Sequence, residues 1–289
     1  MKFSIIIPSL NQGEFIERTL QSVLTQESVD LEIFVVDGGS SDQTLGILEK
    51  FGSRVSWVSE KDGGQADAIN RGLACANGDI LAYLNSDDVY FEGALKRVHD
   101  HFLANSESKI VYGNGEHIDV HDGFVESYPT EAWDYERLGE VCFICQPTTF
   151  WRREVVERFG VFDDRLNFAM DYDYWLRVGR ELEFHYIEGS SLAGSRMYGT
   201  NKTMGQRYEA HREILKVTLN HCRKPPYRWL KALAHVSIEE QMGDRCPPGT
   251  AEFSLEFVER TLRFADEFGI LLSLDECEEL EGHLRGGRL

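Results

Sequence analysis

Short apolar runs alternate with amphipathic segments through the first third of the chain. The runs have the length and residue types of strands and lie at 3–7, 31–36, 55–59 and 80–84. Between the first two runs, Ile16, Leu20 and Leu24 recur at helical spacing. Alternating strands and helices predict parallel βαβ units with right-handed crossovers. We therefore expect an α/β fold with a mostly parallel central sheet flanked by helices.

The sequence changes character after Thr203, where two segments each place apolar residues on one helical face. These residues are Leu230, Leu233, Ala234 and Ile238 in the first segment and Leu255, Val258, Leu262 and Ala265 in the second. Pro247, Pro248 and Gly249 separate the two. We predict one domain over residues 1–205 and a helical C-terminal extension over 206–289.

Composition excludes several classes of partner. The 289 residues carry a formal net charge of −19, from 49 acidic and 30 basic side chains, and this field repels nucleic acid. We expect no nucleic-acid partner. A hydrophobic fraction of 42% is enough for a substantial core. No run approaches the roughly 18 apolar residues of a membrane-spanning helix, and the apolar patch at the start is too short for a secretory signal.

The cysteines have no spacing typical of a disulfide framework, which predicts reduced thiols in a cytoplasmic protein. They are Cys75, Cys142, Cys145, Cys222, Cys246 and Cys277. Cys142 and Cys145 form a C-x-x-C pair, but no second pair follows to complete a zinc site. We expect buried core thiols.

Acidic residues follow two of the predicted strands. Asp37 ends the second strand, and Asp87 and Asp88 follow the fourth. Ligands of open α/β sheets gather at the carboxyl ends of strands, where an acidic pair can bind Mg²⁺ or Mn²⁺ through hard oxygen ligands. Two alternatives stay open: Asp37 as a group that hydrogen-bonds within its own turn, and the pair as a turn with a helix cap.

Five segments, in order along the chain, resemble the family 2 glycosyltransferases with the GT-A fold. They are Ser4–Ser9 (SIIIPS), Val36–Asp42 (VDGGSSD), Asp62–Asn70 (DGGQADAIN), Gly78–Asp88 (GDILAYLNSDD) and Met170–Arg177 (MDYDYWLR). The similarity runs from about Phe3 to Thr203, and five segments in the family's order are specific although each alone is weak. The resemblance implies a GT-A type nucleotide-binding fold.

The resemblance also implies a donor site. Pro8 and Ser9 would flank the nucleotide, and Asp37 would bind the base. The further nucleotide or ribose contacts that it implies come from Asp62, Asp67 and Asn70.

The segment from Asn85 to Asp88 matches the family's metal motif. By resemblance, Asp88 ligates Mn²⁺ or Mg²⁺ at the donor diphosphate, and Asp87 contacts the cation and the ribose or sugar. Asn85 stands where many members have an acid, so we do not expect it to be a direct ligand.

Asp171 matches the family's catalytic base, with Met170 in place of the acid that commonly precedes it. Asp173, two residues on, projects to another side of the helix. Gln146 matches a loop that faces donor sugar or acceptor, with a strand-entry turn as the alternative. Two further residues of the helix are expected to serve packing and an ion pair, namely Trp175 and Arg177.

Ser195–Thr203 resembles the flexible segment that follows the catalytic helix in this family. Tyr198 stands where members often have a histidine, and a tyrosine is a poor substitute for a neutral imidazole ligand. Arg196 and Lys202 are expected to meet the phosphate charge, with a solvated loop as the alternative.

By resemblance, the chain transfers a sugar with inversion from a nucleoside-diphosphate sugar to an acceptor hydroxyl, in cell-surface polysaccharide or glycolipid synthesis. A UDP-sugar is favoured over GDP or dTDP donors. A sugar nucleotidyltransferase would need a glycine-rich loop after the first strand, which Ser4–Gln12 lacks, and a dehydrogenase would need G-x-G-x-x-G there. A non-catalytic nucleotide-sugar binding protein would keep Asp37 and Asp88 but could lose the base.

The expected acceptor is a saccharide or a glycolipid, which would bring the enzyme to the inner face of the membrane in the cytoplasm. The apolar helical faces of the extension are compatible with two further contacts, a peripheral contact with the membrane and a homodimer.

Overall fold

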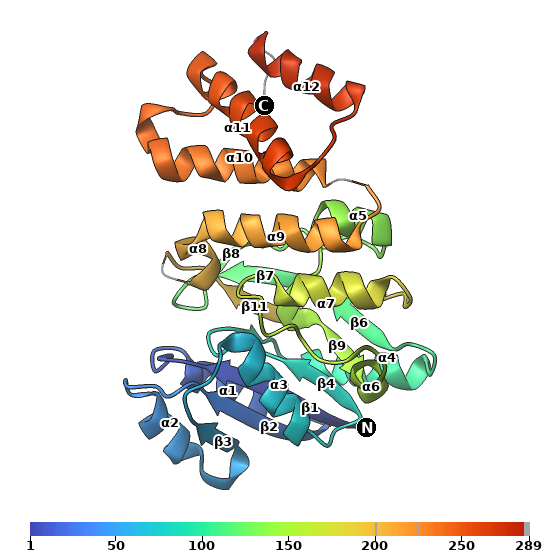
Figure 1. The fold of residues 1–289 in the computed structure, drawn as a ribbon. Coiled ribbons are helices and arrows are strands. Elements are labelled where there is room, and N and C mark those ends of the chain that lie inside the picture. The colour runs from blue at the N-terminus through green and yellow to red at the C-terminus, as the bar shows by residue number, and fades with distance from the viewer. Residues whose placement is uncertain (200, 225, 286–289) are drawn as a thin grey trace. The chain divides into compact units, whose positions relative to one another are not determined.

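The computed structural model describes residues 1–199, 201–224 and 226–285 (Figure 1). The chain divides into two compact units. The first contains Met1–Tyr135 and Cys142–Gly199, and the second contains Glu136–Val141 and Thr200–Leu289. The strands of the described residues belong to the first unit, and the second is helical.

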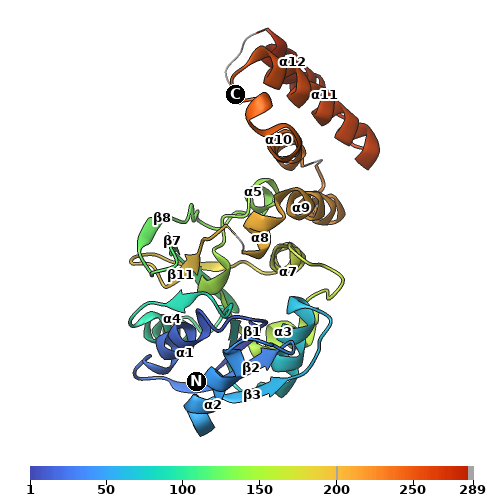
Figure 2. The same ribbon diagram turned by 90° about the vertical axis from the view of Figure 1, so that its left-hand side faces the viewer.

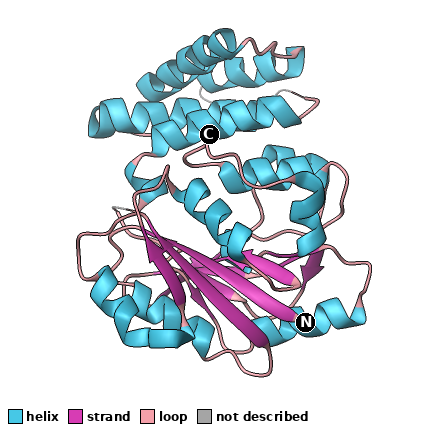
Figure 3. Ribbon diagram, turned by 60° about the horizontal axis from the view of Figure 1, so that its bottom comes forward, coloured by secondary structure: helices cyan, strands magenta, loops and turns pink. Residues whose placement is uncertain are grey.

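Parallel strands form one half of a seven-stranded central sheet with the order β10-β6-β9-β4-β1-β2-β3. β1 (Lys2–Ser9) pairs in parallel with β2 (Asp30–Asp37) and with β4 (Ile80–Tyr83), and β2 pairs in parallel with β3 (Ser56–Ser59). The four predicted strands are therefore confirmed, in an α/β fold with helices on both sides of the sheet (Figure 3).

The other half of the central sheet contains a reversed strand that the apolar runs did not predict. β9 (Phe150–Arg152) pairs antiparallel with both β4 and β6 (Ile110–Gly113). β10 (His185–Ile187) then pairs in parallel with β6. β9 has only three residues, too few for a periodic pattern to be visible.

A second, four-stranded sheet has the order β5-β11-β7-β8. β7 (Gly115–Ile118) and β8 (Phe124–Ser127) form an antiparallel hairpin. β5 (Val89–Tyr90) follows the Asp87-Asp88 pair directly and is antiparallel to β11 (Ala193–Arg196). The second sheet thus brings β11 to the end of the aspartate loop.

The helices of the first unit are α1 (Ile16–Leu24), α2 (Thr44–Phe51), α3 (Gln65–Cys75), α4 (Ala94–Ala104), α6 (Arg153–Phe159) and α7 (Met170–Gly179). Side chains alternate across the pleat of β1. Phe3, Ile5 and Ile7 lie in one buried cluster with apolar residues of α1, α2 and α4. Ile6 faces the other side, where a side chain at Gly72 of α3 would meet it. α1 and α3 lie on opposite sides of the sheet in Figure 2.

The second unit contains most of a short helix, a one-turn helix and four longer helices. They are α5 (Tyr135–Glu140), α8 (Lys202–Gly205), α9 (Arg207–His221), α10 (Tyr227–Met242), α11 (Ala251–Phe268) and α12 (Leu274–Leu284). The predicted α10 face is confirmed, because its four apolar residues are fully buried. The α11 face is only partly right: Val258 and Ala265 are buried, but Leu255 and Leu262 are 49% and 48% exposed, and the larger Phe253, Phe257 and Phe264 are buried in the core.

The extension is thus a helical unit with its own core, as expected of a C-terminal helical region. The assignment of the activity to 1–205 and of an extension role to 206–289 stays a prediction. Among the described residues, no helix combines the length and apolar content needed to cross a bilayer.

The six cysteines, all among the described residues, form no disulfide bond. Burial raises the pKa of the Cys142 thiol to about 12 and that of Cys145 well above its ordinary value. Thiols with raised pKa are poor nucleophiles and poor metal ligands, which agrees with a role in the core.

Replacing Gly72 by alanine tests the close packing of α3 on β1. The added Cβ would lie 2.5 Å from Ile6 Cγ2. We expect Gly72→Ala to lower the free energy of unfolding by about 1–3 kcal/mol, measured by urea denaturation, because overpacking moves neighbouring atoms. Gly46→Ala is the matched control, since Gly46 is an exposed position of α2 and nothing lies within 4 Å of its added Cβ. This control should stabilise by up to about 1 kcal/mol through helix propensity. Equal effects would contradict the packing argument.

Candidate active site

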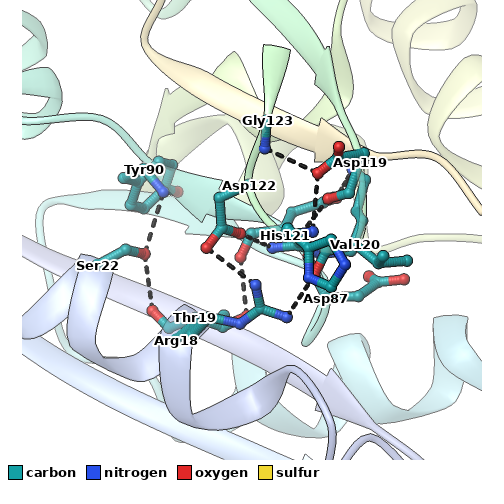
Figure 4. A network of polar contacts seen from close by, with 12 residues as sticks. Arg18, Thr19, Ser22, Asp87, Tyr90, Asp119, Val120, His121, Asp122 and Gly123 are labelled. Carbon is teal, nitrogen blue, oxygen red and sulfur yellow. Dashed lines mark hydrogen bonds and ion pairs between the residues drawn. The ribbon is translucent and has the colours of Figure 1, made fainter. Parts of the chain in front are cut away.

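The loop between β4 and β5 places two acidic side chains at the carboxyl end of a central strand. Its main chain is hydrogen-bonded from both sides. The Thr19 hydroxyl of α1 lies 2.9 Å from Ser86 O and 2.8 Å from Asp88 O, and Arg196 Nε donates to Asp87 O at 2.7 Å. Figure 4 shows Thr19 below this loop. The carbonyls of three consecutive residues therefore have side-chain partners.

Asp88 is 2% exposed, and both of its carboxylate oxygens have donors. Oδ1 accepts from the Arg196 main-chain N–H at 2.8 Å, and Oδ2 accepts from Asn85 Nδ2 at 3.2 Å. Burial raises the pKa of Asp88 well above its ordinary value, and the neighbouring Asp87 charge raises it further. Two carboxylates that repel in a buried place are stabilised in the ionised form by a cation.

Asp87 is partly buried and has a different partner. Its Oδ2 accepts from the Tyr198 hydroxyl at 2.8 Å. Burial raises the pKa of Asp87, while the bond from Tyr198 opposes that shift. Tyr198 thus occupies the histidine position of the family as a hydrogen-bond donor to an aspartate.

The donor set fits a hard divalent cation. Asp87 and Asp88 supply carboxylate oxygens, the ligands that Mg²⁺ and Mn²⁺ prefer, and Mg²⁺ sites commonly add substrate phosphates to one or two carboxylates. Within the described residues, no cluster of three or more His, Cys, Asp or Glu side chains is arranged for a metal. Asp87 and Asp88 would therefore be the ligands that the protein supplies to a metal ion bound here.

Asp37 is fully buried at the end of β2 and organises its own turn. Its oxygens accept from the main-chain N–H groups of Gly39 and Ser40 at 3.1 and 2.8 Å. They also accept from the hydroxyls of Ser40 and, at 2.6 Å, of Ser59. With four donors already on a buried carboxylate, these contacts favour the turn alternative over the expected base contact.

Asp62 lies beside this turn, because a side chain at Gly38 would meet Asp62 Oδ2 at 2.9 Å. Its Oδ1 accepts from Gly64 N at 2.9 Å. Ser9 ends the neighbouring strand β1, and its hydroxyl is buried with no hydrogen-bond partner among the described residues. Asp62, Pro8 and Ser9 are therefore close to the Asp37 turn, and their nucleotide contacts stay a prediction.

Asp67 and Asn70 have partners within the protein, and their expected donor contacts stay a prediction. Asp67 accepts from Gly63 N at 2.8 Å and pairs with Arg71, and the Gly63 bond holds its pKa below the ordinary value. The Asn70 amide exchanges two hydrogen bonds with the main chain of Phe162, at 2.9 and 3.1 Å.

A chain of amides crosses the site, and sequence reasoning missed it. Gln65 Nε2 donates to Asn85 Oδ1 at 2.7 Å, and Asn85 Nδ2 lies 3.4 Å from Gln146 Oε1. Gln146 in turn donates to Tyr83 O at 2.9 Å. The start of α3, the aspartate loop and the 3₁₀ turn Gln146–Thr148 are thereby connected. Gln65 and Asn85 are inside quoted motifs and Gln146 is in a loop that matches the family, but their pairing depends on the tertiary structure.

Asp171 lies in the first turn of α7 and is partly buried, with Oδ1 accepting from Tyr172 N at 2.8 Å. After burial itself, the charges of Asp171 and Asp88 both raise the pKa of the Tyr83 hydroxyl, and both act on Cys145. Asp171 and Asp88 are therefore both near enough to act electrostatically on the same two buried side chains.

Asp173 is occupied elsewhere on α7. It lies 3.7 Å from Arg177, whose guanidinium also donates to Phe159 O at 2.6 Å. Trp175 is fully buried. The packing and ion-pair roles expected for Trp175 and Arg177 are confirmed.

Arg196 has partners inside the protein, and its expected contact with phosphate stays a prediction. Its side chain is buried and donates to main-chain carbonyls and to Asp122, so the structure uses this charge inside the fold. Lys202 is exposed at the start of α8 in the second unit, and its phosphate contact stays a prediction.

The family described as Glycosyl transferase family 2 matches residues 4–160. This chain belongs to that family. A PGL/p-HBAD biosynthesis glycosyltransferase of Mycobacterium tuberculosis is 34% identical over 180 residues, covering 61% of this chain and 68% of that protein. An uncharacterized glycosyltransferase of Rickettsia prowazekii is 26% identical over 249 residues, covering 82% of this chain and 77% of the relative. The chain is thus a nucleotide-sugar-dependent glycosyltransferase.

Solved structures of glycosyltransferases share the fold of this transferase. S. aureus TarS 1-349 in complex with UDP-GlcNAc has a TM-score of 0.64 at 19% identity, covering 99% of this chain and 88% of that one. The mannosyltransferase PcManGT of Pyrobaculum calidifontis, in complex with GDP-Man and Mn²⁺, has a TM-score of 0.60 at 16% identity, covering 96% and 78%. The GT-A fold is therefore confirmed.

Replacing Asp37 by asparagine tests the turn role in this glycosyltransferase. An amide nitrogen would face donors that now meet a carboxylate oxygen. We expect Asp37→Asn to lower the free energy of unfolding by about 2–3 kcal/mol, measured by urea denaturation. Asp30→Asn, exposed at the other end of β2, is the control and should stay within about 0.5 kcal/mol. If Asp37→Asn leaves the free energy of unfolding unchanged but weakens UDP binding in EDTA, the result would favour contact of Asp37 with the base of the donor over a role in the turn.

Proposed function

We propose that this enzyme transfers a sugar, with inversion, from a nucleoside-diphosphate sugar to an acceptor hydroxyl, assisted by Mn²⁺ or Mg²⁺. One observation carries the proposal. Two adjacent carboxylates, the buried Asp88 and the partly buried Asp87, lie at the end of β4, and the charges of Asp88 and of a separate carboxylate, Asp171, both act on the buried side chains of Tyr83 and Cys145. Inverting transfer requires groups of both kinds, one for the leaving diphosphate and one for the acceptor.

The donor would lie between the end of β1 and the aspartate loop. The unpartnered Ser9 hydroxyl and the neighbouring Asp62 supply polar groups there. We favour a UDP-sugar, since TarS has been solved with UDP and with UDP-GlcNAc, with GDP as the alternative on the precedent of PcManGT. Gln146, joined to Asn85, would face the donor sugar or the acceptor.

Asp88 and Asp87 would bind the divalent cation. When bound, such a cation supplies Lewis-acid stabilisation of the charge that develops on the departing diphosphate. The hydrogen bonds from Asn85, Tyr198 and the Arg196 main chain orient the two carboxylates for that contact.

Asp171 would act as the general base. Its carboxylate accepts the proton of the acceptor hydroxyl while the acceptor oxygen bonds to the anomeric carbon and the diphosphate leaves with the electron pair of the broken bond. No covalent enzyme intermediate is needed. Its place in the first turn of α7 favours the ionised form, because the helix dipole stabilises negative charge there.

A saccharide or glycolipid acceptor fits the naming of the mycobacterial relatives for PGL/p-HBAD biosynthesis. We infer that the enzyme works in the cytoplasm, at the inner face of the membrane, in cell-surface polysaccharide or glycolipid synthesis.

Asp171→Asn should lower kcat by about two to four orders of magnitude, because it removes the base while preserving shape. The affinity for UDP should change little. Steady-state kinetics measures kcat, and calorimetry measures the affinity for UDP separately. Asp173→Asn is the matched control, since it changes a carboxylate of the same helix that pairs with Arg177. This control should alter stability and retain turnover.

The stereochemistry of the product is the second test of the same role. Transfer from an α-linked donor should give a β-linked product by NMR. A retained α-linkage, or full activity in Asp171→Asn, would contradict the mechanism and leave the nucleotide site unaffected.

Asp88→Asn should abolish turnover and the increase in nucleotide affinity that Mn²⁺ produces. The reason is that a neutral amide loses the charge that a hard cation requires. Calorimetric titrations of UDP, GDP and dTDP with Mn²⁺ and with EDTA measure both the effect and the choice of base. Parental transfer rates in Asp88→Asn would remove the metal assignment, and tightest binding of GDP or dTDP would overturn the preference for UDP.

A further inference from the structure

The guanidinium of Arg196 is a buried cation at the end of β11, with no exposed side-chain area. Burying a charge costs free energy unless partners compensate for it. Arg196 has such partners on the aspartate loop and on a hairpin turn distant in sequence.

Arg196 contacts the aspartate loop in two ways. Its main-chain N–H donates to Asp88 Oδ1 at 2.8 Å, and its Nε donates to Asp87 O at 2.7 Å. The Arg196 Cζ also lies 4.9 Å from the centre of the Phe15 ring. A shift of this side chain would therefore move the main chain that carries both aspartates.

The other end of the guanidinium binds the turn between β7 and β8. Arg196 Nη1 donates to Asp119 O, and Nη2 pairs with Asp122 Oδ1. The second oxygen of Asp122 accepts from Arg18 Nη1 at 2.9 Å. One carboxylate thus bridges two arginines, from β11 and from α1. Figure 4 shows Arg18 and Asp122 of this bridge.

The turn itself is arranged to present that carboxylate. Asp119 Oδ1 accepts from the N–H groups of His121 and Gly123, both at 2.8 Å. Asp122 has a φ of 68°, in the left-handed region that a residue other than glycine adopts at a cost. Arg18 Nη2 donates to Val120 O at 2.9 Å and closes the turn against α1.

We propose that Asp122 is a positioning residue for donor and cation binding, acting through Arg196 on the main chain of Asp87 and Asp88. The proposal rests on the proposed function. An exposed ion pair alone contributes little to stability. Arg196 is buried, however, so loss of the Asp122 charge removes a carboxylate that compensates the buried cation, while the bonds of its side chain to the carbonyls of Asp87 and Asp119 remain.

Asp122→Asn tests this role, because it removes the charge of a side chain that is 40% exposed and lies outside the aspartate loop. Loss of groups that orient metal ligands commonly weakens metal binding by about 10–100-fold. We expect the affinity for UDP with Mn²⁺ to fall by about that factor, while the affinity in EDTA stays within about twofold. Arg18→Gln should weaken the affinity in the same direction with a smaller effect, since Asp122 keeps its ion pair with Arg196.

Hydrogen exchange gives a readout that needs neither metal nor activity. The amides of residues 85–90 should exchange faster in Asp122→Asn, although they lie more than 30 residues away in sequence. Glu126→Gln is the matched control, since it changes a carboxylate of the same hairpin that pairs with His117. It should leave both the exchange at 85–90 and the Mn²⁺-dependent affinity at parental values.

Parental exchange at 85–90 together with parental UDP affinity in Asp122→Asn would overturn the proposal, as would equal effects of Glu126→Gln. A parent protein that binds UDP equally in Mn²⁺ and in EDTA would instead contradict the metal part of the proposed function. In that case the exchange rates still decide whether Asp122 positions the aspartate loop.

Discussion

The donor site depends on the burial of two adjacent carboxylates at the end of β4. Asp88 is almost completely buried, and Asp87 beside it raises its pKa further. Such a pair is unfavourable without compensation, and the protein provides part of it through oriented donors from Asn85, Tyr198 and the Arg196 main chain. A divalent cation would provide the rest.

Segments far apart in the sequence converge on this loop. Thr19 of α1 and Arg196 of β11 bind its carbonyls, while Gln65 and Gln146 meet at the amide of Asn85. We therefore expect a change in any of these segments to alter the position of the two aspartates. This connection gives a physical reason why a turn on the second sheet can affect a site on the first.

The sequence predicted the parallel half of the sheet, the helices around it and the position of the acidic pair. These features follow from local patterns, since a buried strand has to be an apolar run and its carboxyl end is where polar side chains can reach a ligand. The reversed strand β9 was not predicted, because three residues carry no period. The predicted face of α11 was wrong at Leu255 and Leu262, because the spacing of apolar residues takes no account of their size. Three larger phenylalanines of the helix are buried in the core instead.

The sequence by itself determined the family of the chain, its α/β fold and the residue types at the strand ends. Only the tertiary structure decided which of these residues are available to a ligand. Asp37, Asn70 and Arg196 had the chemistry expected of donor contacts, yet each is bound by partners inside the protein. Arg196 and Asp122 are 74 residues apart, and no local period relates them. A hydrogen bond requires its two atoms to be within about 3 Å, and only the folded arrangement of the strands brings such atoms together.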